Sequence, residues 1–207
     1  MALFADRAEA GRDLAAHLEQ WRGSHAVVAG IARGGVVVAA SVAAELALSL
    51  TAVAVRKLGV PGHEEVALGA IAEGVRVIDG RTVRHAAVDD AELAQIEERE
   101  RAVLSHRQGL IPDAAPLLHG RTVLLIDDGI ATGSTARAAV AGVRAAAAGI
   151  VLAIPVAPAD WRPDPGSVDE YVCAHPMERL WAVGAYYDDF TQTSDEEVVR
   201  LLRGDGR

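Results

Sequence analysis

The sequence predicts an α/β protein built on a parallel, doubly wound sheet. Two short apolar runs, at residues 26–31 and 122–126, are each followed by a glycine-bearing turn and then by a helical stretch. Strands and helices alternate along the chain, which is the order typical of a parallel sheet covered by helices. A chain of 207 residues that is 51% hydrophobic and 24% charged is expected to form one globular domain over residues 1–207.

Each element follows from a local pattern. In the first half we expect, in order, a strand at residues 26–31, the turn Arg33-Gly34-Gly35, a helix over residues 36–48 and a strand at residues 51–55. Glycine and proline interrupt any periodicity between residues 58 and 74, which predicts a long functional loop.

The second half contains one surface helix and a further run of alternating elements. Residues 89–107 are charged and helical, and Leu93, Ile96, Val103 and Leu104 supply only a thin apolar side, so a solvated helix is expected. There follow a strand at residues 122–126, an alanine-rich helix ending at Ala148 before Gly149, strands at residues 150–155 and 170–174, and a helix from Ser194 to near Leu202.

Composition excludes several classes of protein. The net charge of −9 disfavours non-specific binding to nucleic acid or to an anionic membrane. The single cysteine, Cys173, rules out an intramolecular disulfide and is typical of a reducing compartment, so a cytoplasmic location is expected. No apolar run reaches the ~18 residues of a membrane span, and no two histidines stand four residues apart as in a zinc-protease helix. Lys57 is the only lysine.

The segment 123–135 carries the most chemical information. An apolar strand ends in the adjacent carboxylates Asp127 and Asp128, and a turn of small residues then leads into a helix N-terminus. Amides and hydroxyls of residues 131–135 can surround a phosphate. Two acids would repel that phosphate unless they face sugar hydroxyls, Mg²⁺ or both, so a phosphorylated sugar is predicted. A mononucleotide P-loop is excluded because this turn has no lysine.

This segment resembles the signature of the type I phosphoribosyltransferases. The resemblance implies their fold, with a small C-terminal hood at about residues 175–190 and a flexible loop at about residues 58–74. It implies that Asp127 and Asp128 hold the ribose hydroxyls of phosphoribosyl pyrophosphate (PRPP). It also implies that the 5′-phosphate is bound by the turn that follows, namely Ala131, Thr132, Gly133, Ser134 and Thr135.

The first turn and the second strand also resemble the family. Arg33, Gly34 and Gly35 stand where these enzymes bind pyrophosphate, often with a cis peptide bond in the turn, and glycine lets the backbone approach an anion closely. Arg56 and Lys57 follow the second strand, as in the adenine and orotate enzymes, so both are expected to contact pyrophosphate.

Three further positions are less closely matched. His63 is one residue late for the loop histidine of the orotate enzymes and is equally well explained as an exposed histidine. In the hood, Trp181 matches the aromatic residue that covers the base in the hypoxanthine enzymes, and Asp188 matches the acid that reaches a metal. The alternative for this aromatic segment is a small hydrophobic core under a C-terminal helix. Ala131 replaces the acid of the hypoxanthine enzymes, which disfavours an oxopurine.

The sequence therefore predicts a Mg²⁺-dependent phosphoribosyltransferase that transfers phosphoribosyl from PRPP to a nitrogen acceptor, with a nucleobase as one candidate, and releases pyrophosphate. Lys57 and Asp128 are the expected catalytic residues, and Asp127, Asp128 and Asp188 are the expected metal ligands. The expected partners are PRPP, a small-molecule acceptor that the residues do not identify, and a second copy in a homodimer, with no nucleic acid and no membrane. A non-catalytic PRPP sensor is the alternative, although no helix-turn-helix precedes residue 20, and a hydrolase or salvage enzyme for another phosphosugar is a third.

Overall fold

The fold is taken from a computed structural model that describes residues 2–204, except for the side chains of residues 64 and 65. The elements are, in chain order, α1 (Arg7–Ala16), η1 (Glu19–Trp21), β1 (Val27–Ala32), α2 (Gly34–Leu46), β2 (Ser49–Val60), β3 (His63–Ala72), β4 (Val75–Ile78), α3 (Gly80–His85), α4 (Asp90–Leu110), α5 (Ala115–Leu118), β5 (Thr122–Ile126), α6 (Ser134–Arg144), β6 (Gly149–Pro158), β7 (Glu170–Met177), η2 (Val183–Tyr186) and α7 (Asp195–Arg203).

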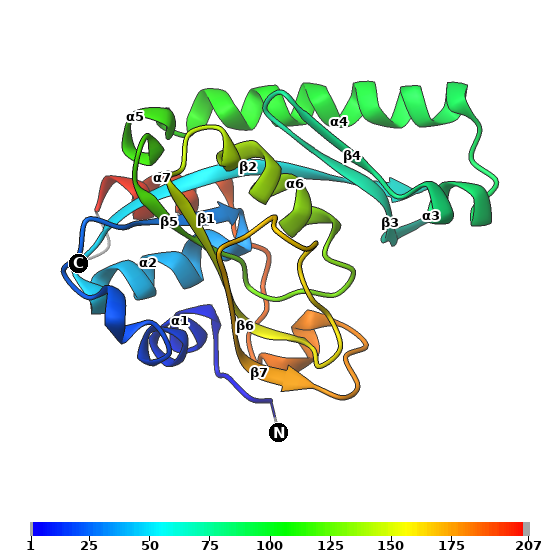
Figure 1. Ribbon diagram of the computed structural model, residues 1–207. Helices are drawn as coiled ribbons and strands as arrows, with labels where there is room; N and C mark the ends of the chain where they lie inside the picture. Colours follow the sequence, from blue (N-terminus) through cyan, green and yellow to red (C-terminus); the bar gives the residue numbers. More distant parts are fainter. Residues whose placement is uncertain (1, 205–207) are drawn as a thin grey trace.

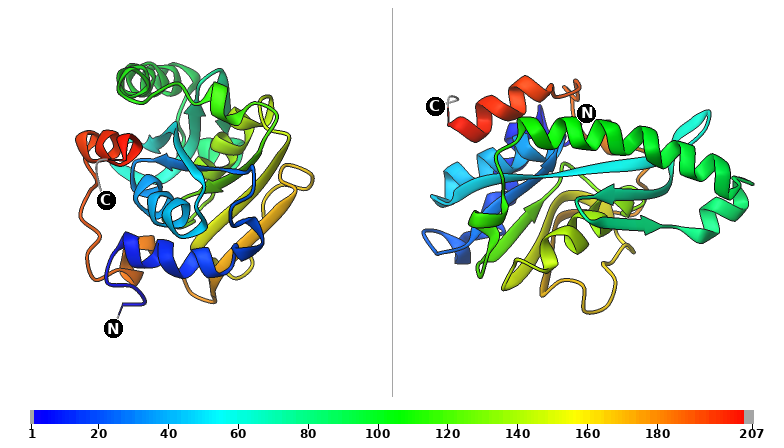
Figure 2. Two further views of the ribbon diagram at one scale, coloured as in Figure 1. Left: turned by 90° about the vertical axis from the view of Figure 1, so that its left-hand side faces the viewer. Right: turned by 90° about the horizontal axis from the view of Figure 1, so that it is seen from above.

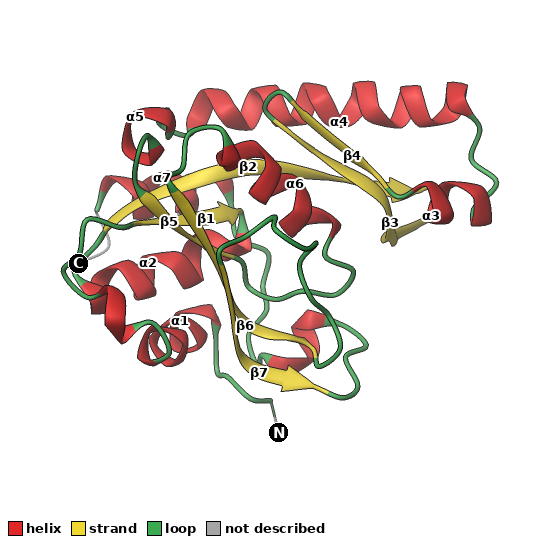
Figure 3. Cartoon of the chain, in the orientation of Figure 1, coloured by secondary structure: helices red, strands yellow, loops and turns green. Residues whose placement is uncertain are grey.

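The described strands form one seven-stranded sheet in the order β4-β3-β2-β1-β5-β6-β7 (Figures 1 and 3). Neighbouring strands from β2 to β7 in that order are parallel, whereas β3 pairs antiparallel with β2 and with β4. The expected α/β fold with a parallel sheet is thus confirmed. The antiparallel hairpin extends one edge of the sheet away from its centre.

Helices cover both faces of the sheet because its central strands are apolar on both sides. All six residues of β1 are buried, as in strands that are covered on both faces. α6 packs on one face against alternate residues of β1 and β5, and α1 and α2 cover the other face. α7 lies beside α2 on that second face, and α4 lies on the far side of α7 from α2 (Figure 2). No helix within residues 2–204 is both long and apolar enough to cross a membrane.

The central elements agree with their local patterns, and the differences lie at their ends. β5 has the expected bounds, whereas α6 ends at Arg144 rather than at Ala148. β2 and β7 are longer than expected because each continues to pair with a neighbouring strand. α1 is an element that the sequence patterns did not predict, although Asp6 provides an ordinary N-cap by accepting a hydrogen bond from the Glu9 amide at 2.7 Å.

The expectation of a loop at residues 58–74 is wrong, because most of this segment forms the β2–β3 hairpin. Gly62 and Gly74 both have positive φ angles, 75° and 64°, and lie in the turns between strands. Gly69 lies within β3, where a Cβ atom would overlap the Val77 carbonyl oxygen of β4. These glycines interrupt the hydrophobic pattern but permit tight turns and close strand pairing.

α4 is more closely integrated into the fold than a solvated helix. Leu93, Ile96 and Leu104 are buried against the hairpin, while Val103 is 37% exposed. The ion pair between Glu97 and Arg101 that the spacing favours is present at 2.6 Å. The apolar side of α4 is narrow because it contacts one strand pair and not a whole sheet.

Candidate active site

The turns after β1 and β5 meet at one edge of the sheet. The two strands are parallel neighbours, with Gly30 beside Ile126, so their carboxyl ends lie together, where open α/β sheets bind ligands. A Cβ atom on Gly35 would lie 2.8 Å from the Ile126 carbonyl oxygen and 2.9 Å from Asp127 Oδ1, and one on Gly34 would overlap the Asp128 carboxylate. Only glycine allows this approach. The peptide bond between Ala32 and Arg33 is cis, as the resemblance implies.

Asp128 is held by an arginine that the sequence patterns did not indicate. Arg7 Nε donates to Asp128 Oδ2 at 2.8 Å, and the two side chains are only 10% and 17% exposed. The Arg7 guanidinium also donates to the Thr191 carbonyl oxygen at 2.9 Å and lies 3.8 Å above the centre of the Phe190 ring. Arg7 and Asp128 are 121 residues apart, so no local motif connects them.

The two carboxylates differ in their electrostatic surroundings. Burial, and then the neighbouring charge of Asp128, raise the pKa of Asp127 well above its usual range. Burial also raises the pKa of Asp128, but the positive charge of Arg7 opposes this rise. Asp127 Oδ1 accepts a hydrogen bond from the Asp128 amide at 2.9 Å. The pair is therefore favourably placed for ligands that supply hydroxyl donors or a cation.

The turn after Asp128 forms the start of α6. Gly133 has φ 83° and immediately precedes α6, whose first amides have no partner within the helix. Ser134 is buried, whereas Ala131 and Thr132 are exposed. The indole of Trp161 packs against Gly133 so closely that a Cβ atom there would overlap it. Arg137 donates to the Thr132 carbonyl oxygen at 3.2 Å, which links the turn to the first part of α6.

The predicted pyrophosphate residues lie on neighbouring strands. Ala54 of β2 pairs with Ala32 of β1, so Arg56 and Lys57 follow close to the Arg33 turn. Arg56 donates to Glu100 Oε2 of α4 from Nε at 2.8 Å and from Nη2 at 2.5 Å. Because alternate residues of a strand point to opposite faces, Arg56 and Lys57 lie on opposite faces of β2. Lys57 is thus a strand residue and not a loop residue.

The hood combines a hydrophobic core with an exposed tryptophan. Tyr187 is buried against Phe4, and its hydroxyl donates to the Asp128 carbonyl oxygen at 2.6 Å. The small-core alternative therefore describes Tyr187, although the cover comes from the N-terminal segment and not from a C-terminal helix. Trp181 is 91% exposed and packs on no neighbouring ring among the described residues, and Asp188 is exposed as well.

Asp127 and Asp128 fit Mg²⁺ only if substrate oxygens and water complete its coordination. Within residues 2–204 no group of three or more His, Cys, Asp or Glu side chains is arranged to hold a metal, so Asp188 does not join Asp127 and Asp128 in such a cluster. Mg²⁺ commonly binds through one or two carboxylates together with substrate oxygens and water. Asp127 and Asp128 supply adjacent carboxylates of that kind.

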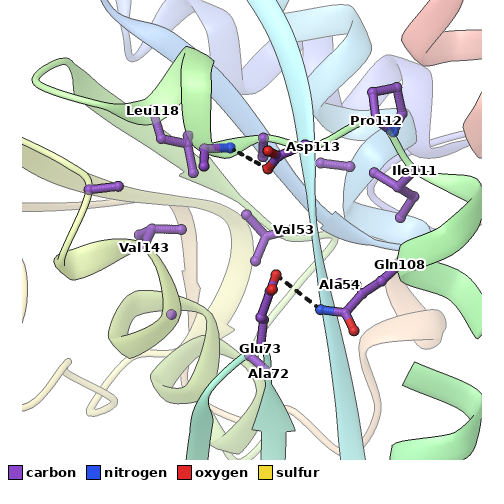
Figure 4. Close-up of a pocket in the computed structure, with 15 residues that line it drawn as sticks. Val53, Ala54, Ala72, Glu73, Gln108, Ile111, Pro112, Asp113, Leu118 and Val143 are labelled. Atoms are coloured by element: carbon purple, nitrogen blue, oxygen red, sulfur yellow. Dashed lines mark hydrogen bonds between the residues drawn. The ribbon is translucent and has the colours of Figure 1, made fainter. Parts of the chain in front are cut away.

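Two cavities lie apart from these turns. One, of about 160 Å³, is lined by residues of β2, α5 and α6 and by the end of α4, and beside it Gln108 donates to Glu73 at 3.2 Å (Figure 4). None of the predicted site residues lines it. The other is near the tip of the hairpin, where the exposed His63 lies with Arg81 and His85. His63 is therefore separate from the acid pair.

Comparison with known proteins agrees with this arrangement. A family model described as "Phosphoribosyl transferase domain" matches residues 5–187. A Mycobacterium tuberculosis H37Rv protein named "Putative phosphoribosyl transferase Rv0571c" is 47% identical over 210 residues, which cover 98% of this chain and 47% of that protein. The chain thus spans about half the length of the curated relatives that it matches.

Solved structures show the same fold. The protein TT1426 from Thermus thermophilus is 38% identical, the match covers 98% of each chain, and the TM-score is 0.70. A hypothetical protein from Neisseria gonorrhoeae, solved with bound ppGpp, is 14% identical over 99% of this chain and 98% of that one, with a TM-score of 0.54. The family model covers most of the chain and the mycobacterial relative shares 47% of the aligned residues, so the protein belongs to the phosphoribosyltransferase family that residues 123–135 indicate.

Proposed function

We propose that the protein transfers the phosphoribosyl group of PRPP to a nitrogen acceptor and releases pyrophosphate. The observation that carries this proposal is the contact between the two turns: Gly34 and Gly35 lie directly against Asp127 and Asp128. A backbone turn suited to an anion and a carboxylate pair suited to hydroxyls are thereby adjacent. PRPP presents a diphosphate and two ribose hydroxyls on neighbouring atoms, which matches this pairing.

In the proposed complex each part of PRPP has its own residues. Asp127 and Asp128 accept hydrogen bonds from the ribose hydroxyls. The amides and hydroxyls of residues 131–135 bind the 5′-phosphate at the start of α6, where the helix dipole favours negative charge. Arg33 lies on the turn after β1, and Arg56 and Lys57 lie on opposite faces of the adjoining strand β2. Arg33 and Lys57 bind the diphosphate, and Arg56, which is paired with Glu100, adds positive charge from the other face.

The chemical step separates charge, and the residues are placed to stabilise both products of that separation. The bond between the anomeric carbon and the pyrophosphate oxygen breaks, its electrons leave with pyrophosphate, and the acceptor nitrogen forms the new bond to carbon. Asp128 stabilises the positive charge that develops on the ribose, and Lys57 and Arg33 stabilise the negative charge on the leaving group. When bound, Mg²⁺ would neutralise part of the diphosphate charge, with Asp127 and Asp128 as its protein-side ligands.

The acceptor is constrained by what the turn lacks. Ala131 provides no carboxylate to take a proton from an oxopurine ring. An acceptor is therefore favoured whose reacting nitrogen loses its proton easily, or in which another group of the same molecule takes that proton. The exposed Trp181 offers a flat apolar surface at the hood, where a heterocycle could stack. The homodimer usual in the family and the cytoplasmic location stay predictions.

One assay tests the proposal directly. Pyrophosphate release is measured with PRPP, Mg²⁺ and a panel of purines, pyrimidines and small amines. Release that depends on one acceptor supports the transfer reaction. Tight binding of PRPP without release for any acceptor contradicts it and favours the PRPP sensor. Phosphate or ribose release that needs no acceptor would identify a hydrolase instead.

A further inference from the structure

Three arginines from different elements lie near the turn after β1, residues 33–35. Arg33 belongs to the turn after β1, Arg56 to β2 and Arg107 to the last turn of α4. The Arg107 side chain is only 7% exposed, and its Nε donates to Asp195 Oδ1 of α7 at 3.0 Å. The same oxygen lies 3.9 Å from Arg33 Nη1, which is beyond hydrogen-bond distance. Asp195 is therefore shared unequally between two arginines.

The arginines of this cluster outnumber the carboxylates that lie within 4 Å of them. Glu100 pairs with Arg56, and Asp195 faces both Arg107 and Arg33. The exposed Glu196 also attracts Arg33, but from farther away. Burial, and the positive charges of Arg56 and Arg33, lower the pKa of Arg107, and the charge of Asp195 opposes them. The guanidinium keeps its proton at neutral pH. The three arginines lie where the proposed reaction needs an anion site.

Asp195 is kept in place by apolar packing and by a helix cap. Val198 of α7 is buried with Ala32 and Ala52, so the first turn of α7 lies over the end of β1. α7 contacts both α2 and α4, and Figure 2 shows it between them. The Ser194 hydroxyl caps α7 by accepting a hydrogen bond from the Glu197 amide at 3.1 Å. The Asp195 carboxylate is thus held near both arginines.

We propose that Arg107 is a positioning residue for the anion site, because it engages Asp195 and so leaves the guanidinium of Arg33 available to bind pyrophosphate. Without Arg107, the carboxylate of Asp195 has only Arg33 as a partner, and the gap of 3.9 Å closes to an ion pair that competes with the ligand. This inference rests on the proposed function, which takes Arg33 as a pyrophosphate ligand.

The test is a double-mutant cycle read by pyrophosphate affinity, measured by calorimetry in the presence of Mg²⁺. Arg107→Met should weaken binding about tenfold, the loss expected when a charged ligand forfeits one hydrogen bond. Asp195→Asn should bind more tightly than wild type, because a carboxylate near the anion is removed. The double variant should bind within about twofold of Asp195→Asn, the usual error of additivity.

Two other outcomes would overturn the inference. If Arg107 contacts the anion itself, its loss still costs about tenfold when Asp195 is already Asn, so the double variant binds about tenfold more weakly than Asp195→Asn. If Arg107 only supports the fold, Arg107→Met binds pyrophosphate as tightly as wild type, and the double variant binds it as tightly as Asp195→Asn. The unfolding midpoint of both variants that lack Arg107 falls. Arg101→Met is the matched control, because Arg101 is on the same helix, pairs with Glu97 and lies outside the cluster. Should Arg107→Met fail to fold, Arg107→Gln takes its place in the cycle with the same expected signs.

The cycle separates this inference from the proposed function. A wild-type protein that binds pyrophosphate but transfers nothing contradicts the proposed reaction, while the coupling between Arg107 and Asp195 can still be measured. A wild-type protein that transfers phosphoribosyl but shows no such coupling contradicts this inference alone. A protein that binds neither PRPP nor pyrophosphate contradicts both.

Discussion

Asp127 and Asp128 are adjacent on one half-buried turn, and Arg7 forms an ion pair with Asp128, while its charge acts only more weakly on Asp127. Arg7 Nε is 2.8 Å from Asp128 Oδ2, whereas Asp127 accepts a hydrogen bond from a backbone amide. The two carboxylates thus have different partners before any ligand binds.

The double variant Asp127→Asn and Asp128→Asn should abolish PRPP binding and leave the fold intact. The amides keep the size of the side chains but replace strong acceptors for the ribose hydroxyls and remove the negative charge. Calorimetry with PRPP measures binding, and circular dichroism checks the fold. Unchanged PRPP affinity in this variant would refute the role given to the pair.

Gly34→Ala should lower PRPP affinity at least about tenfold, because one methyl group displaces a charged ligand-binding side chain. The new Cβ atom would overlap the Asp128 carboxylate and lie 2.9 Å from Arg7 Nε, so the carboxylate must move. Gly109→Ala is the control, since a Cβ atom there meets nothing within 4 Å. Equal affinities for the two variants would show that the close approach has no functional importance.

Lys57→Ala should raise the Michaelis constant for PRPP or lower turnover by about tenfold, the cost of one charged contact. Lys57→Arg should not restore full activity, because a planar guanidinium cannot replace a compact ammonium in the same geometry. Steady-state rates of pyrophosphate release measure both. Arg76→Ala, at an exposed ion pair on β4, is the comparison that should leave the rates unaltered.

At the scale of elements, the β2–β3 hairpin and α4 share a separate hydrophobic cluster at one edge of the sheet (Figure 1). Leu58, Leu68 and Ile71 of the hairpin pack against Ile96 and Leu104 of α4. This packing places Glu100 of α4 against Arg56 of β2, and Arg107 of α4 against Asp195 of α7. The position of α4 is therefore coupled to the charges of the proposed anion site.

Leu58→Ala should reduce the free energy of unfolding by about 2–5 kcal/mol, the range for removing a fully buried leucine. The cavity would lie between the hairpin and α4. Urea denaturation measures the loss. Val103→Ala, on the exposed side of α4, should change stability far less, and similar losses in the two variants would contradict the burial of Leu58 between the hairpin and α4.

At the scale of the whole molecule, the site joins elements from both ends of the chain. Arg7 of α1, the turns after β1 and β5, and Asp195 of α7 all contribute. A ligand that binds these groups bridges elements that separate on unfolding. Binding at the turns should therefore stabilise the entire fold and not only the loops.

PRPP with Mg²⁺, at a free concentration of about 100 times its Kd, should raise the unfolding free energy by about 2.7 kcal/mol. Thermal or urea unfolding with and without PRPP measures this increase. The double variant Asp127→Asn and Asp128→Asn should show no increase. An equal gain in the variant would place the binding site elsewhere.

Sequence patterns predicted the parallel sheet and the turn at residues 127–135 because both depend on local order. A buried strand and a helix start are encoded by neighbouring residues, and β5 has the expected bounds. The hairpin at residues 58–74 was not predicted, because Gly62, Gly69 and Gly74 interrupt the periodicity while serving turns and strand contacts. α1 was not predicted because charged residues are interspersed along it and its apolar side is short.

The sequence by itself determined the fold class, the family and the positions of Asp127, Asp128 and the turn that follows, since these lie within one continuous segment. Only the tertiary structure decided which charges meet there. Arg7 and Asp128 are 121 residues apart, and Arg107 and Asp195 are 88 residues apart. Such pairs form when packed helices and strands bring distant residues together, and no spacing along the chain specifies them.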